Sequence, residues 1–139
     1  MVEDDSMRPT LVPGDRLLVD PRDAVGVTAR RGAIVVVPDP GQERRWLVKR
    51  AAAVGPATVY VVRTGVEVRS PDSCEPPPSD AIDRCEVSDG SLYVVSDGPT
   101  GSRDSRTFGP VPLRSVLGVA WWRYAPRERA GPLGVRPKV

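Results

Sequence analysis

Residues that break helices are spread along the whole chain and set the strongest limit on its fold. The 139 residues include 16 prolines and 13 glycines. Proline removes a backbone donor and glycine carries a large entropy cost, so both interrupt helices. The intervening runs are short and rich in valine, which suits the pleated, half-buried surface of a sheet. The sequence predicts an all-β fold, a small and partly closed antiparallel β-structure.

Seven short runs bounded by turn-forming residues are the predicted strands. They are expected at residues 16–20, 33–37, 45–53, 58–63, 66–69, 91–96 and 116–124, with one helical turn at 113–116. Residues 1–126 are assigned to one domain, and residues 70–89 to an irregular surface insert within it. Residues 127–139 contain prolines and scattered arginines and are expected to form a disordered C-terminal tail.

The charged residues exclude several classes of site. The net charge of +2 gives no argument for nucleic acid as a partner. The chain has no histidine, which excludes histidine-based protease triads and histidine-ligated zinc sites. No apolar run approaches the roughly 20 residues of a membrane span, and the first residues are acidic. We therefore expect a cytoplasmic or membrane-associated protein that has no transmembrane segment and uses no cofactor.

A serine precedes a constrained turn near the N-terminus. Ser6 is followed by Met7, Arg8 and Pro9. Pro9 fixes its own φ and biases Arg8 toward an extended backbone. Ser6 is thereby held on a defined, non-helical piece of chain, as a serine nucleophile requires. An ordinary turn serine would fit the same pattern, so this motif alone does not decide the function.

Lysine is rare in this chain, and one lysine lies inside a predicted strand. Eighteen of the 20 basic residues are arginines, and the lysines are Lys49 and Lys138. Strand alternation places Lys49 and Arg50 on opposite faces, so one of these charges points toward the interior or a cleft. A desolvated lysine can lose its proton at neutral pH, whereas arginine cannot. Lys49 is thus a candidate general base for Ser6, the alternative being a surface lysine.

A polar loop follows the strand expected at residues 91–96. It contains Asp97, Ser102, Asp104 and Arg106, and it is rich in groups that form charge-assisted hydrogen bonds. Asp104 and Arg106 are spaced so that they could pair and stiffen the loop. A hydroxyl such as that of Ser102 could hold a neutral lysine amine in place. The alternative is a solvated polar loop.

Together, the three segments resemble the type I signal peptidases, which are serine endopeptidases with a Ser-Lys dyad. The family pattern runs Ser-Met-x-Pro-Thr-Leu, Gly-Asp, Lys-Arg, Gly-Asp-Asn, Ser-x-Asp-Ser-Arg and Gly-x-Val-Pro. The matching segments keep this order across residues 6–120. They are Ser6 to Leu11, Gly14-Asp15, Lys49-Arg50, Ser96-Asp97-Gly98, Ser102 to Arg106 and Gly109 to Pro112.

The resemblance implies roles for the matching residues of a catalytic core. Ser6 would be the nucleophile and Lys49 the general base, with Ser102 orienting the lysine. Two ion pairs would support the site, and three apolar side chains would line pockets for small residues. The pairs are Asp104 with Arg106 and Arg50 with Asp97, and the apolar side chains are Met7, Leu11 and Val48.

The activity that the resemblance implies is cleavage of N-terminal signal or leader peptides after small residues, typically Ala-x-Ala, through an acyl-enzyme. The partner would be a preprotein or precursor leader that binds as an added strand, with peripheral membrane contact as an option. One alternative is a maturation protease for a cytosolic precursor such as nickel superoxide dismutase. The others are a self-cleaving repressor-type peptidase and a degenerate peptide-binding module.

Two departures from the family pattern concern the site itself. Asp4 stands two residues before Ser6, where the bacterial enzymes usually have a hydroxyl or a glycine. An ionised carboxylate cannot donate to an oxyanion and would repel its developing charge. The Gly-Asp-Asn triplet is replaced by Ser96-Asp97-Gly98, which weakens the assignment of the second ion pair.

Cys74 and Cys85 flank part of the expected insert. A disulfide between them would close a loop of about a dozen residues and would stabilise the fold by on the order of 3 kcal/mol. Two reduced thiols are the alternative.

Overall fold

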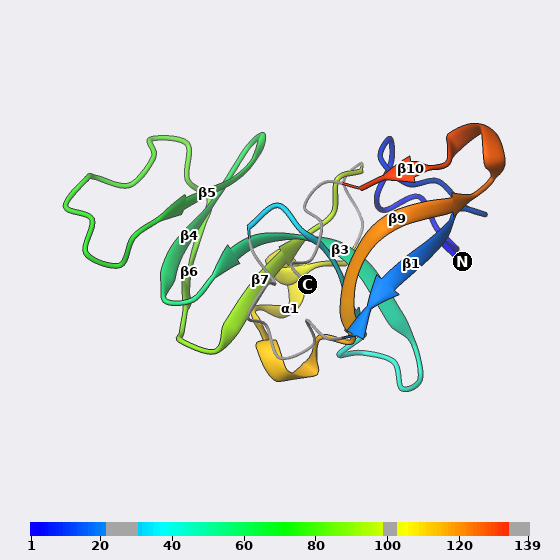
Figure 1. Ribbon diagram of the computed structural model, residues 1–139. Helices are drawn as coiled ribbons and strands as arrows, with labels where there is room; N and C mark the ends of the chain where they lie inside the picture. The colour runs from blue at the N-terminus through cyan, green and yellow to red at the C-terminus, as the bar shows by residue number, and fades with distance from the viewer. Residues whose placement is uncertain (22–30, 99–102, 134–139) are drawn as a thin grey trace.

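The computed structural model describes residues 1–21, 31–98 and 103–133. These residues form two antiparallel sheets and one short helix, α1 (Ser105–Phe108) (Figure 1). The larger sheet has the strand order β1-β9-β2-β3-β7-β8, with β10 beside β9. Its strands are β1 (Arg16–Asp20), β9 (Gly118–Ala125), β2 (Ile34–Pro38), β3 (Trp46–Val54), β7 (Ser91–Val95), β8 (Val111–Pro112) and β10 (Gly131–Pro132).

A three-stranded sheet extends from the far end of β3. Its order is β5-β4-β6, formed by β5 (Gly65–Arg69), β4 (Ala57–Val62) and β6 (Asp83–Val87). In Figure 1 this sheet and its long loop lie at the left, away from β1, β9 and β10. The turn between β4 and β5 nevertheless reaches the segment after β7, because Arg63 to Val66 line a small pocket together with Ser96 to Gly98.

Two apolar clusters in the larger sheet determine where the N-terminal segment lies. The first cluster fills the interior under β2, β3, β7 and β9 and includes Val35, Leu92 and Val94, which are all fully buried. The second cluster packs Met7 and Leu11 of the N-terminal segment against the neighbouring strands. β2 is a nearly continuous buried run, which explains why its sequence is almost entirely valine and isoleucine.

The expected fold class is confirmed, and the predicted strands are present with boundaries shifted by one or two residues. The helical turn expected at 113–116 is the 3-10 turn η2 (Leu113–Ser115). Sequence reasoning missed α1, β6, β8 and β10. All four elements are short or polar, so none carries an apolar period long enough to be recognised.

Two expectations about irregular segments are wrong in part. The segment 70–89 contains β6, an edge strand that pairs with β4 and exposes most of its side chains. The segment 127–133 is also ordered, because η3 (Arg127–Arg129) and β10 pack against β9 and Leu133 is buried. Residues 134–139 of the expected tail lie outside the described residues.

The tentative disulfide is not formed. Cys74 is an exposed free thiol in the loop before β6, and Cys85 is a half-buried free thiol on β6. The pairing of β6 with β4 fixes Cys85 in the small sheet, where it packs against an apolar cluster that includes Ala53, Val59 and Tyr93. In the part of the chain that the structure describes, no helix is long and apolar enough to span a membrane.

Candidate active site

The segment that carries Ser6 is folded back against the strand that follows it. The Val2 N–H donates to the Asp15 carbonyl at 2.8 Å, and the Gly14 N–H donates to the Val2 carbonyl at 2.8 Å. Met7 and Leu11 point into the second apolar cluster and are almost completely buried. Ser6 is therefore presented on a loop whose two ends are fixed by backbone pairing and by apolar burial.

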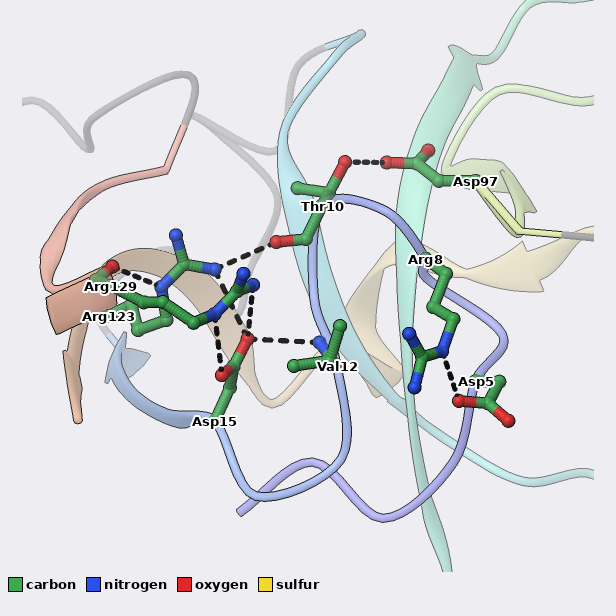
Figure 2. A network of polar contacts seen from close by, with 8 residues as sticks. All are labelled: Asp5, Arg8, Thr10, Val12, Asp15, Asp97, Arg123 and Arg129. Atoms are coloured by element: carbon green, nitrogen blue, oxygen red, sulfur yellow. Dashed lines mark hydrogen bonds and ion pairs between the residues drawn. The ribbon is translucent and has the colours of Figure 1, made fainter. Parts of the chain in front are cut away.

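A buried carboxylate holds this loop against β9. Asp15 is fully buried and accepts hydrogen bonds from the Val12 N–H at 3.0 Å and from the guanidinium groups of Arg123 and Arg129, each at 3.2 Å (Figure 2). Arg123 also donates to the Thr10 carbonyl at 2.8 Å. Burial alone would raise the pKa of Asp15, but the Val12 and arginine hydrogen bonds outweigh it and lower that pKa.

A second ion pair holds the same loop from the other side. The guanidinium of Arg50 pairs with Asp97, and it also donates to the Gly32 carbonyl at 3.0 Å. The Thr10 hydroxyl donates to the Asp97 carboxylate at 2.8 Å, which links the loop that carries Ser6 to the end of β7 (Figure 2). The expected pair of Arg50 and Asp97 is thus present, although Asn is missing from the triplet.

Lys49 is the lysine of β3, and its side chain points inward. It is 2% exposed, whereas Arg50 on the opposite face is partly exposed. The Lys49 Nζ donates to the Ser96 Oγ at 2.8 Å. Burial lowers the pKa of Lys49, while the carboxylates of Asp4 and Asp104 act in the opposite direction, and the net shift is downward.

Asp104 is the buried support beneath the lysine. It is fully buried and caps α1 by accepting the Arg106 N–H at 3.0 Å. Its carboxylate also accepts the Ser96 N–H at 2.9 Å and forms the expected ion pair with the Arg106 guanidinium at 2.6 Å. Burial alone would raise the pKa of Asp104, but these hydrogen bonds and the arginine charge lower it.

The backbone of Ser6 is held in place by two contacts. Its carbonyl accepts the Gly98 N–H at 2.7 Å. A Cβ at position 98 would lie 2.6 Å from the Asp5 carbonyl oxygen and 2.8 Å from the Ser6 carbonyl oxygen, so only glycine fits this approach. The Ser6 N–H donates to the Asp4 carboxylate at 3.0 Å.

Asp4 contacts Ser6 and also acts on Lys49 through its charge. Burial alone would raise the pKa of Asp4, but hydrogen bonds from the Ser6 N–H and hydroxyl and the charges of Lys49 and Arg45 lower it. The Arg45 Nη2 lies 3.6 Å from the Asp4 Oδ2. The Asp4 carboxylate therefore accepts a hydrogen bond from Ser6 and interacts with the charge of Lys49 at longer range, and it is ionised at neutral pH.

A cleft of about 420 Å³ opens beside Ser6. Two of the expected pocket residues, Met7 and Val48, contribute to its wall, together with Val36 and Trp46. The third, Leu11, is completely buried beneath the loop and supports the wall from behind. The cleft thus combines a polar end at Ser6 with an apolar surface.

One edge of β3 is open beside this cleft. β2 pairs with β3 from Trp46 to Arg50, but β7 pairs with β3 only from Arg50 to Val54. Ala51 makes its backbone hydrogen bonds on the β2 side, so by alternation the peptide groups of Val48 and Trp46 face the other edge. Among the described strands, none pairs with β3 along that edge.

Ser102 and Ser96 differ from expectation. Ser102, which the resemblance implies as the lysine-orienting hydroxyl, lies outside the described residues. Ser96 takes part in the site, although its hydroxyl was not singled out from the sequence. The available signal was the replacement of the first glycine of the Gly-Asp-Asn triplet by a residue with a side chain.

The chain is similar in sequence to known signal peptidases and inner membrane proteases. The chain is 34% identical to the mitochondrial ATP-independent inner membrane protease subunit 1b of Arabidopsis thaliana over 134 residues, which are 95% of this chain and 72% of that protein. It is 31% identical to a probable signal peptidase I-1 of Synechocystis over 148 residues, covering 96% of this chain and 74% of the relative. A solved signal peptidase I from Enterococcus faecalis has a TM-score of 0.49 and 22% identity, covering 65% of this chain and 94% of that one.

The match to a protein family spans almost the whole folded region. Residues 1–125 match the family described as signal peptidase, peptidase S26. The matched residues include the loop that carries Ser6, strand β3 with Lys49 and the ion pairs described above. This chain therefore belongs to the signal peptidase family, peptidase S26.

Proposed function

We propose that this chain is a Ser-Lys endopeptidase that removes N-terminal signal or leader peptides after small residues. The observation that carries the proposal is the inward-facing amine of Lys49, which is buried, has a lowered pKa and donates to the neutral hydroxyl of Ser96. In a chain without histidine, a lysine with a lowered pKa is a group that can act as a base near neutral pH, whereas arginine is not.

The mechanism follows from these groups. The neutral Lys49 amine takes the proton from the Ser6 hydroxyl, and the Ser6 Oγ attacks the scissile carbonyl carbon. When the tetrahedral intermediate collapses, the C–N bond breaks and the leaving amine takes the proton from Lys49. The acyl-enzyme on Ser6 is then attacked by a water that gives a proton to the same amine, and the Ser6 Oγ takes this proton back as its bond to the acyl carbon breaks.

Stabilisation of the oxyanion requires a rearrangement at Asp4. The Ser6 N–H is the donor expected for the oxyanion, and it is engaged by the Asp4 carboxylate. A substrate carbonyl must displace that carboxylate before the N–H can stabilise negative charge. The mechanism therefore includes movement of Asp4 toward its partner Arg45 when substrate binds.

The open edge of β3 supports an extended leader peptide as the substrate. The peptide groups of Val48 and Trp46 are available to pair with an added strand, which would place alternate side chains in the cleft. The apolar wall formed by Met7 and Val48 favours short apolar side chains over charged ones. The preference for Ala-x-Ala is part of the proposal and rests on the family resemblance.

One observation favours a second function, a peptide-binding module without catalysis. Asp4 engages the Ser6 N–H and hydroxyl, which are the groups that chemistry would need free. In that case leader peptides would bind the β3 edge and remain intact.

The test is cleavage of a panel of leader peptides, including Ala-x-Ala sequences and a cytosolic precursor leader, with products identified by mass spectrometry. Wild type is expected to cleave, whereas Ser6→Ala and Lys49→Arg are expected to be inactive, the latter because arginine keeps the charge but cannot deprotonate. Ser73→Ala, an exposed serine in the remote loop, is the matched control. Binding without cleavage by folded wild type would support the binding module instead.

A further inference from the structure

We propose that Ser96 is the positioning residue that holds the Lys49 amine in its reactive orientation, a role that rests on the proposed Ser-Lys function. The contact is direct, because the Lys49 Nζ and the Ser96 Oγ are 2.8 Å apart. Both side chains belong to residues that are more than nine-tenths buried. Bulk water is therefore a poor competitor for this hydrogen bond.

The backbone of Ser96 is itself fixed. Its N–H donates to the Asp104 carboxylate, and Arg106 pairs with the same carboxylate. The Asp104 carboxylate is thus in direct contact with Ser96 and Arg106. It interacts with Lys49 only through its charge at longer range. The lysine contacts a neutral hydroxyl, and a direct carboxylate partner would have stabilised the ammonium far more strongly.

A hydroxyl acceptor matches what a lysine base needs. A neutral amine has two N–H groups and one lone pair, and free rotation about Cε–Nζ would spread that lone pair over all directions. When one N–H is bound by Ser96, the rotation is restricted and the lone pair can be held toward Ser6. The resulting gain is in positioning, which commonly affects rates by on the order of 10²-fold when it is lost.

Ser96 also departs from the family pattern at this point. The first position of the Gly-Asp-Asn triplet is glycine in the pattern and serine in this chain. A glycine offers no hydroxyl, so this contact belongs to the present sequence. The resemblance assigns the same task to Ser102, and the two residues can be separated by experiment.

The experiment compares the pH dependence of kcat/KM for wild type, Ser96→Ala, Ser96→Thr and Ser102→Ala. Ser96→Ala is expected to lower the plateau by roughly 10- to 100-fold. It should also move the acid limb to lower pH, because the removed hydroxyl accepted a bond from the ammonium. Ser96→Thr keeps a hydroxyl and should restore most of the plateau. Thermal unfolding of each variant controls for folding.

A second readout does not depend on activity. The chain has two lysines, so labelling with lysine carrying ¹³C at Cε gives two signals, and Lys138→Arg assigns them. The Lys49 signal should titrate at lower pH in Ser96→Ala than in wild type, while the Lys138 signal stays unchanged. A merely structural role for Ser96 would leave the Lys49 titration in place.

The outcomes distinguish the role of Ser96 from the proposed Ser-Lys function. Active wild type with an unchanged plateau and an unchanged Lys49 titration in Ser96→Ala would overturn the role of Ser96 and leave the proposed function standing. Loss of activity in Ser102→Ala alone, with Ser96→Ala like wild type, would assign the task to Ser102 and overturn the inference. Inactive, folded wild type would overturn the proposed function and the role of Ser96 together.

Discussion

Replacement of Asp4 is expected to increase activity, which is unusual for a side chain that contacts the nucleophile. The Asp4 carboxylate accepts a hydrogen bond from the Ser6 N–H at 3.0 Å and competes with the substrate carbonyl for that donor. It also raises the pKa of Lys49 relative to burial alone, so it keeps more of the base protonated. Removal of the carboxylate should relieve both effects.

The size of the effect follows from the exposure of the carboxylate. A hydrogen bond to a charged group contributes roughly 1.5–3 kcal/mol when it is well shielded. The Asp4 side chain is 50% exposed, so about half of that value, about 0.8–1.5 kcal/mol, is the expected scale after screening. This corresponds to a gain of roughly four- to twelvefold in kcat/KM for Asp4→Ala or Asp4→Ser.

The assay is the pH dependence of kcat/KM on one cleaved leader peptide. Asp4→Ala should raise the plateau and move the acid limb to lower pH, because Lys49 loses a carboxylate that favours its charged form. Asp4→Asn keeps an acceptor oxygen without the charge and should lie between Asp4→Ala and wild type. Asp5→Asn changes the neighbouring carboxylate, which pairs with Arg8, and serves as the control. A plateau that falls in Asp4→Ala would refute this reasoning and would make Asp4 a required group.

Three further predictions concern stability and geometry. Asp15→Asn should lower the free energy of unfolding by about 2–3 kcal/mol in urea titrations, because it leaves partly buried arginines without their carboxylate. Folding lowers the pKa of Asp15, so its contribution to the free energy of unfolding should be present above about pH 5. That contribution should be lost as the pH falls through the folded-state pKa, and Asp15→Asn should not show this loss. Gly98→Ala should reduce kcat/KM by on the order of 10²-fold, since its Cβ would displace the Ser6 carbonyl, and wild-type activity in that variant would contradict the observed approach. A reducing agent should leave Tm unchanged, because Cys74 and Cys85 are free thiols, whereas a drop in Tm would show that they are bonded.

The strands could be predicted because each has a strong local signal. β2 is an uninterrupted apolar run, and β3 and β4 are bounded by prolines and glycines. β6 gave no such signal because it is an edge strand with mostly exposed, polar side chains. Its position is set by pairing with β4, which is a tertiary effect.

The contacts of the site could be predicted where both partners belong to one short sequence motif. The pairing of Asp104 with Arg106 follows from a spacing of two residues and the cap of α1. The contact between Lys49 and Ser96 joins residues 47 positions apart in sequence. Such a contact depends on the register of β3 with β7, which local sequence does not contain.

The role of Asp4 could be predicted in part. The sequence indicated that a carboxylate was out of place two residues before Ser6 and left open whether it points away. Its direction is decided by a short local hydrogen bond back to the Ser6 N–H, and its charge is balanced by the more distant Lys49 and Arg45.

The most direct test of the central claim is to trap the acyl-enzyme and locate it by peptide mapping. Wild type incubated with an activated ester of an Ala-x-Ala peptide should gain one acyl mass on the peptide that contains Ser6. Ser6→Ala should gain none, and Lys49→Arg should gain none on the same timescale, because its side chain cannot take the Ser6 proton. An adduct on another residue, or an unchanged rate of acylation in Lys49→Arg, would contradict a Ser6–Lys49 dyad.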